Sequence, residues 1–283
     1  MAFSRESECS METRFGKLLS LLLLLTLPAA VEAQWSYTTN NGSITITQYS
    51  CSDASVTIPD TIDGLPVTSI GTQAFQGCVI LTNVTLGNRI TSIGDWAFYE
   101  CTNLTIVTFD NNVISIGAQA FKDCVNLPSV SLPSSIVSIG EWAFADCSSL
   151  TSITIPNSVT NIGYGAFEYA SSLTNVLIGD GVTSIGNGAF VFCTSLTTIT
   201  VDSLNPVYSS FGGVVFSKSQ TTLFAYPEGK AGSYSIPNSV TSIGDSAFSF
   251  CGNLSGVTIP DSVTNIGNYA FCVCTSLDRK SVV

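Results

Sequence analysis

The stretch "VTSIGNGAFVFCTSLTTIT", Val182–Thr200, decides the fold, because the chain spells nearly the same phrase in other places. Close copies are "ITSIGDWAFYECTNLTIVT" at Ile90–Thr108 and "VTSIGDSAFSFCGNLSGVT" at Val240–Thr258. The Phe of the Ala-Phe pair recurs every 23 residues, first in six units and then in two more. These phenylalanines are Phe75, Phe98, Phe121, Phe144, Phe167, Phe190, Phe248 and Phe271. A fixed period of this length is the signature of a repeat protein.

Each unit contains two segments with different hydrophobic periods. The "AFxxC" segment spaces Ala, Phe and Cys as on one side of a helical turn. The "LTxVTI" segment alternates, as in a strand with one buried face. One unit cannot bury its own apolar side, whereas stacked units bury it against one another. The sequence therefore predicts a repeat solenoid of 23-residue units, each with short strands plus one helical turn.

The repeat also carries a family resemblance. The consensus "L-x-x-V-x-L-P-x-S-V-T-S-I-G-x-x-A-F-x-x-C" resembles the BspA-type leucine-rich repeat of bacterial cell-surface proteins, from Gln34 to about Leu277. The resemblance implies a leucine-rich-repeat solenoid with a role in surface adhesion and in binding host or matrix proteins. Two features depart from the family: no membrane or wall anchor is recognisable, and the last unit gives way to "DRKSVV". We therefore expect the C-terminal cap to be truncated.

The start of the chain has the pattern of a secretory signal peptide. Arg14 and Lys17 precede the apolar run Leu18–Ala30, and small residues follow up to Ala33. We expect the mature protein to begin at Gln34, with no membrane-spanning segment, and to be secreted or displayed on the cell surface.

The predicted organisation has six parts. Between Phe190 and Phe248 the period is interrupted by 58 residues, one unit plus 35. Inside this gap, "GGVVFSK" and "TTLFAYP" are expected to pair as a hairpin, which forms either an elaborated rung or a dedicated binding element. The parts are a signal peptide (1–33), an N-terminal cap with a hairpin turning at Asn41-Gly42 (34–66), repeats (67–201), the insertion (202–235), repeats (236–277) and a non-repeat tail (278–283).

Composition excludes several function classes. The formal net charge of −11 would repel nucleic-acid phosphates, so no nucleic-acid partner is expected. The chain has no His, which removes Ser-His-Asp and Cys-His nucleophile systems and the commonest metal ligand. We expect no catalysis, no cofactor and no metal.

The cysteines form a regular series, three residues after the repeat Phe. In the fifth unit this position holds Ala170, which cannot form a disulfide. Neighbouring parallel rungs also hold Cβ atoms farther apart than a disulfide requires. We therefore expect buried free thiols, with a stapled solenoid as the alternative, and Cys51 and Cys272 lie outside the series. The series comprises Cys78, Cys101, Cys124, Cys147, Cys193, Cys251 and Cys274.

The position just before each of these cysteines changes character along the chain. It holds Glu100, Asp123 and Asp146 in early units, which suggests a solvated acidic edge or, as the sharper alternative, a Ca²⁺ site. In later units the position becomes aromatic, and exposed apolar surface often marks a contact site. Contacts between units explain the aromatic residues equally well. The residues of this candidate second interface are Tyr169, Phe192 and Phe250.

The strand segments place short polar side chains on either side of a buried Val or Ile. Such residues are good strand formers, and they also offer a hydrogen-bonding surface for an extracellular protein or glycoprotein on a concave sheet. A structural, self-associating surface component is the alternative function, and ice binding is a minor one because Ile106, Leu177 and Gly256 interrupt the polar rows. The candidate binding residues are Asn83, Thr85, Thr108, Ser131, Thr154, Asn175, Thr200 and Thr258.

Overall fold

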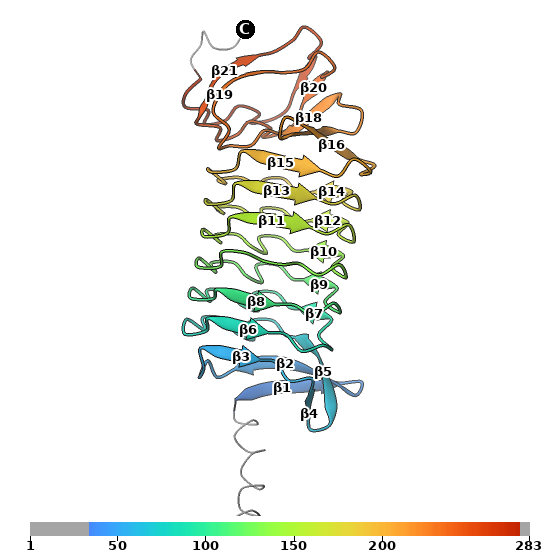
Figure 1. Cartoon of the computed structure of the whole chain (residues 1–283), viewed down its shortest axis with the longest axis vertical. Coiled ribbons are helices and arrows are strands. Elements are labelled where there is room, and N and C mark those ends of the chain that lie inside the picture. The colour runs from blue at the N-terminus through green and yellow to red at the C-terminus, as the bar shows by residue number, and fades with distance from the viewer. Residues whose placement is uncertain (1–33, 278–283) are drawn as a thin grey trace, which may run out of the picture.

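The protein is an elongated stack of rungs (Figure 1). The computed structural model describes residues 34–277, so the expected signal peptide and C-terminal tail lie outside the described residues. The chain climbs from the β1–β2 hairpin at one end to β19 and β21 at the other, one rung per repeat.

One side of the stack is a sheet of very short strands. After the antiparallel β1–β2 pair, in which Asn41 and Gly42 of the turn have φ of 51° and 76°, the strands along the stack pair in parallel, and only β4 pairs antiparallel, with β5. Partners are one period apart, as in Ile93↔Ile116. The strands are β1 (Trp35–Asn40), β2 (Ser43–Tyr49), β5 (Leu65–Ile70), β7 (Ser92–Ile93), β9 (Ser115–Ile116), β10 (Ser138–Ile139), β12 (Asn161–Ile162) and β14 (Ser184–Ile185), with β4 (Thr61–Ile62) beside β5.

A second side of the stack carries the "LTxVTI" strands in three separate parallel groups. The chain between Ser129 and Ser131 is not a regular strand and separates the first group from the second. The groups are β3 (Ser55–Thr57), β6 (Asn83–Thr85) and β8 (Ile106–Thr108); β11 (Ser152–Ile155), β13 (Asn175–Ile178) and β15 (Thr198–Val201); and β19 (Gly232–Ser235) with β21 (Leu254–Thr258).

The expected helical turn is wrong: residues 34–277 contain no helix. The "AFxxC" segment is a run of overlapping four-residue turns, such as Cys101 N to Phe98 O at 3.2 Å. Every second N–H leaves the rung instead, as Phe98 N does to Ala120 O at 2.7 Å. This alternation puts Trp96 and Glu100 in the left-handed region, at φ of 54° and 58°. Hydrogen bonds to the next rung therefore replace those within a helix.

The core is a ladder of identical side chains. The rings of Phe98 and Phe121 stack with centroids 5.1 Å apart and planes 5° apart, and both side chains are fully buried. Rungs approach so closely at the Gly of "SIG" that a Cβ on Gly140 would lie 2.5 Å from the carbonyl carbon of Gly117. The buried residues form two clusters, which meet at the insertion, around Val214 and Val215.

The insertion holds four strands, of which the first three form an antiparallel unit and the fourth, β19, belongs to the second side of the stack. β17 (Val214–Ser217) pairs antiparallel with β16 (Tyr208–Phe211) on one side and with β18 (Thr222–Ala225) on the other. β18 then pairs in parallel with β20 (Ser242–Ile243), which pairs with β22 (Asn265–Ile266). Thus β18 takes the place that a two-residue strand has in an ordinary unit.

The cysteine series is free except at its first member. Cys51 and Cys78 form a disulfide with Cα atoms 5.2 Å apart, so the expectation of a free Cys78 is wrong. The rung-spacing argument does not apply here, because Cys51 comes from the cap and not from the neighbouring rung's cysteine position. The other members are free, and Cys124 Sγ donates to Phe98 O of the preceding rung at 3.3 Å.

Candidate binding surfaces

The candidate sheet residues form columns on one side of the stack. Val84 and Val107 are buried, while Thr85 and Thr108, which follow them, are exposed and are cross-strand partners. Asn83 is half-buried, and Thr154, Asn175, Thr200 and Thr258 are exposed on their strands.

The structure brings most of these residues together in two patches. Asn83, Thr85 and Thr108 share the β3–β6–β8 sheet, while Thr154, Asn175 and Thr200 share the β11–β13–β15 sheet. Ser131 lies outside a regular strand, in the rung between the patches. Thr258 is separated from the second patch by the insertion.

Two kinds of hydroxyl occur on this side of the molecule. Thr105 Oγ1 donates to Thr82 O at 3.0 Å, and Thr174 Oγ1 to Thr151 O at 3.0 Å, so these hydroxyls tie one rung to the next. The side chains of all eight candidate residues make no hydrogen bond within residues 34–277. Their donors and acceptors are open to a partner.

Apolar side chains interrupt the polar columns. Ile106 is 53% exposed and Leu177 is 44% exposed on the same face. A surface of this composition offers hydrogen bonds and small apolar contacts with little charge, which suits a neutral protein or glycan surface.

Tyr169, Phe192 and Phe250 form one continuous strip along the flank. The rings of Tyr169 and Phe192 stack with centroids 4.3 Å apart, and those of Phe192 and Phe250 are 4.2 Å apart. The rings thus contact one another between units, and Tyr169 remains 46% exposed. All three residues have a left-handed φ, of 59° to 60°.

The acidic edge of the early units includes a lysine that the repeat pattern does not single out and that pairs with two of the carboxylates. Lys122 Nζ lies 2.6 Å from Asp146 Oδ2 and 3.8 Å from Asp123 Oδ2. Burial raises the pKa of Asp123, partly opposed by the charge of Lys122. The ion pair ties two neighbouring units together at this edge.

The buried thiols are unsuited to nucleophilic chemistry. Burial raises the pKa of the Cys101 thiol to about 12, and it also raises the pKa of the Cys124 and Cys147 thiols. A nucleophilic cysteine needs the opposite shift and access to solvent.

A further group that sequence reasoning missed is Glu228 of the insertion. Its side chain is 5% exposed and its Oε1 accepts a hydrogen bond from Phe192 N at 2.8 Å. The signal in the sequence was weak, because the insertion lacks the Ala-Phe pair that sets the register elsewhere.

The chain matches the sequence profile described as BspA type Leucine rich repeat region, over residues 44–128, 114–232 and 220–282. A leucine rich cell surface protein from Faecalibacterium prausnitzii A2-165 is 32% identical, over 88% of this chain and 76% of that one, with a TM-score of 0.67. The T. pallidum leucine rich repeat protein is 26% identical, over 88% and 90% of the two chains, with a TM-score of 0.54.

The pneumococcal vaccine antigen PcpA shares the fold, with 24% identity, a TM-score of 0.77, and coverage of 88% of this chain and 68% of that one. A comparison with curated proteins gave no match. Within residues 34–277, no helix has the length and apolar character needed to cross a membrane.

Proposed function

Because the chain belongs to the BspA-type leucine-rich repeat family, we propose that it is a secreted or cell-surface binding protein without catalytic activity. Its partner is an extracellular protein or glycoprotein, bound on the side of the stack that carries the two sheet patches. The leucine rich cell surface protein of F. prausnitzii supports an extracellular setting for a chain of this kind.

The observation that carries the proposal is the contrast between the two kinds of hydroxyl. Hydroxyls such as that of Thr105 are consumed between rungs, whereas those of Thr85, Thr108, Ser131 and Thr154 have no partner in the described chain. Each new hydrogen bond contributes only about 0.5–1.5 kcal/mol, so affinity depends on many of them along the column. Few charges take part, so binding should depend weakly on salt.

The test replaces Thr108, Ser131 and Thr154 together by Lys. These side chains are exposed and unbonded, so the fold should be retained, while the desolvation cost of three new charges removes binding to immobilised extracellular-matrix extract. The matched control, N111K/S134K/N238K, adds the same charge at exposed loop positions off the sheet and should bind normally. Equal loss in both variants, or in neither, contradicts the sheet-face site.

The aromatic strip is the competing site. The variant F192N/F250N removes both rings and keeps residues that tolerate a left-handed φ, so it isolates the rings from the backbone. Loss of binding here, with normal binding by the triple Lys variant, would move the site to the strip.

Self-association is the competing function, favoured by the same exposed strip. A structural surface component should assemble by itself, so sedimentation velocity over a concentration series separates the two functions. A concentration-dependent increase in mass without any partner would replace partner binding as the function.

A further inference from the structure

The ladder of hydrogen bonds between rungs stops at one level. In the rung of Phe167, three N–H groups donate to the next rung: Gly165 to Asn187 O, Phe167 to Ala189 O and Tyr169 to Val191 O, at 3.2, 2.8 and 3.0 Å.

In the rung of Phe190 only one of the three equivalent N–H groups has a partner. Phe192 N donates to the Glu228 side chain, while Gly188 N and Phe190 N make no hydrogen bond within residues 34–277.

A short turn in the insertion explains the break. Leu223 pairs with Ile243, and Tyr226 N donates to Ala247 O at 2.8 Å, as Phe248 N does to Ala270 O. Tyr226 therefore occupies the position of the repeat Phe, but it follows Leu223 by three residues where Phe248 follows Ile243 by five. The two missing residues belong to the turn that would cover the rung of Phe190.

A cavity of 240 Å³ takes the place of that turn, between the two core clusters. Ile185 and Phe190 line it and are half-buried, whereas Ile162 and Phe167, one rung earlier, are fully buried. An apolar cavity of about 150 Å³ holds benzene, so this one has room for a ring and a small polar group.

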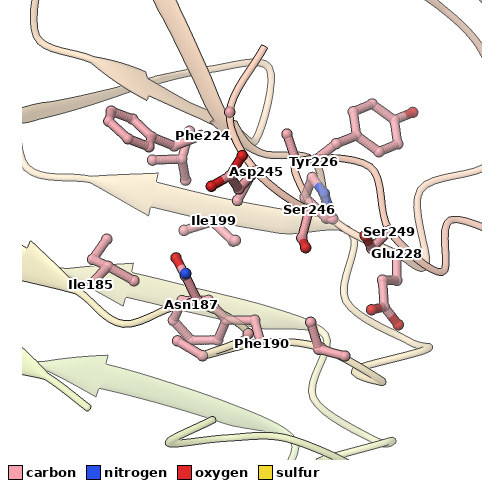
Figure 2. Close-up of a pocket in the computed structure, with 18 of the residues that line it drawn as sticks. Ile185, Asn187, Phe190, Ile199, Phe224, Tyr226, Glu228, Asp245, Ser246 and Ser249 are labelled. Atoms are coloured by element: carbon pink, nitrogen blue, oxygen red, sulfur yellow. The ribbon is translucent and has the colours of Figure 1, made fainter. Parts of the chain in front are cut away.

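Polar side chains lie at both ends of the cavity. In Figure 2, Glu228 and Ser249 lie at one end, and Ile185 and Phe224 lie at the other, with Asn187 and Asp245 near them. Oε2 of Glu228 is buried without a hydrogen-bond partner. The ring of Phe192, from the rung of Phe190, contacts the ring of Phe250, from the rung of Phe248.

The buried acid is neutral near pH 7. Burial raises the pKa of Glu228 to about 8, opposed by the Phe192 N–H. Since Oε1 accepts from Phe192 N, the proton resides on Oε2, which becomes a hydrogen-bond donor. Three donors without acceptors thus belong to residues that line this mixed polar and apolar cavity: Gly188 N–H, Phe190 N–H and the buried Glu228 Oε2–H.

We propose that this cavity binds a small neutral molecule with an apolar body about the size of one aromatic ring and a carbonyl or carboxamide oxygen. The oxygen accepts hydrogen bonds from the unpaired donors, and the body contacts Ile185, Phe190 and Phe224. Asp245 also lines the cavity and disfavours an anionic ligand.

The test uses phenylacetamide as the probe and phenylacetate as its anionic counterpart, with the isotope-labelled protein followed by amide NMR at pH 7. Phenylacetamide should bind with a Kd of about 1 mM, as expected for a ligand of this size, and phenylacetate at least about tenfold more weakly. The amides of Gly188 and Phe190 should shift, while those of Gly165 and Phe167, which are already bonded, should not.

Two variants complete the test. I185F fills the cavity and should abolish binding, whereas E228Q keeps a donor and should bind at pH 7. Above pH 8 the wild type should lose affinity as Glu228 ionises, and E228Q should not.

Three results would overturn the proposal: no saturation at ten times the expected Kd, unchanged binding by folded I185F, or shifts confined to the sheet face. Should I185F fail to fold, the amide shifts and the E228Q pH profile decide alone. The sheet variant with three lysines should bind the probe normally, so this site and the proposed partner surface fail independently.

Discussion

A single glycine position shows how closely the rungs approach. Gly140 has no positive φ, yet a Cβ there would lie 2.5 Å from Gly117 C and 2.6 Å from Ala118 N. Both neighbours are backbone atoms, which cannot move without breaking hydrogen bonds to other rungs. The "SIG" glycine is therefore required by packing between rungs and not by a turn conformation.

We expect G140A to lower the free energy of unfolding by about 1–3 kcal/mol or more, because the added methyl group overpacks the backbone. Urea unfolding measures it. G244A is the matched control: Gly244 has the same place in its unit, but its Cβ would meet no atom nearer than Leu223 O at 3.1 Å, next to the shortened turn. Equal losses for the two variants would refute the packing explanation.

Glu228 should make stability depend on pH. Its pKa rises from 4.5 to about 8 on folding, so between these values the folded protein holds a proton that the unfolded chain has lost. Its titratable neighbours are the thiols of Cys193, Cys251 and Cys274, whose pKa values burial also raises. The free energy of unfolding should thus fall as pH increases through this window, with a slope approaching about 1.4 kcal/mol per pH unit.

In E228Q this slope should disappear, and the variant should be more stable than the wild type at pH 7.5. Chemical denaturation between pH 5 and 8 is the measurement. The same slope in both proteins would show that Glu228 does not titrate as a buried acid.

The free cysteines lead to a further prediction at the scale of the residue. Denatured, unreduced protein comprising residues 34–277 should titrate seven thiols, since Cys51 and Cys78 are bonded to each other. In the native protein, Cys272 and Cys274 should react first because both are only partly buried. Two or fewer thiols after denaturation would indicate a solenoid stapled by disulfides.

At the scale of the element, a rung is stable because both of its neighbours cover it. Ile162 has a rung on each side and is fully buried, while Ile185 in the next rung is half-buried beside the cavity. The two residues occupy paired positions on β12 and β14. An isoleucine at the same position in two adjacent rungs is therefore packed on all sides in one rung and borders the cavity in the next.

This difference predicts opposite responses to the same substitution. I162F should cost about 1–3 kcal/mol through overpacking, whereas I185F should cost less than about 1 kcal/mol because the larger ring enters the cavity. The melting temperatures of the two variants measure the contrast. A larger loss for I185F would mean that the cavity cannot accept a ring.

At the scale of the whole molecule, the break divides the stack into a larger and a smaller core. The larger cluster runs from Trp35 to Val215 and the smaller from Val214 to Ala270, and two hydrogen bonds of the ladder are absent between them. Solenoid stability is approximately a sum of rung and nearest-neighbour terms, so the weakest junction limits cooperativity.

We expect the smaller core to open first. Native-state hydrogen exchange should give a lower opening free energy for the amide of Phe248 than for that of Phe121, since each is bonded to the next rung but lies in a different core. Identical exchange free energies across both cores would show that the junction transmits stability fully.

The sequence by itself determined the solenoid, its period and its inward-facing residues. Stacked identical rungs require identical inward side chains, so the 23-residue period alone placed Phe98 and Phe121 in one ladder. It also identified the residues that flank the buried strand valines, because alternation in a strand is a local property.

Only the tertiary structure decided which residues of different rungs meet. The turns at Phe98 use hydrogen bonds to the next rung, Cys51 reaches Cys78 from the cap, and the turn before Tyr226 is two residues short. Local periodicity carries no information on such contacts, since each depends on two segments distant in sequence. The stacking of the rungs also decides which hydroxyls are bonded between rungs and which are free on the sheet face. The cavity at Glu228 likewise exists only because of how the rungs stack.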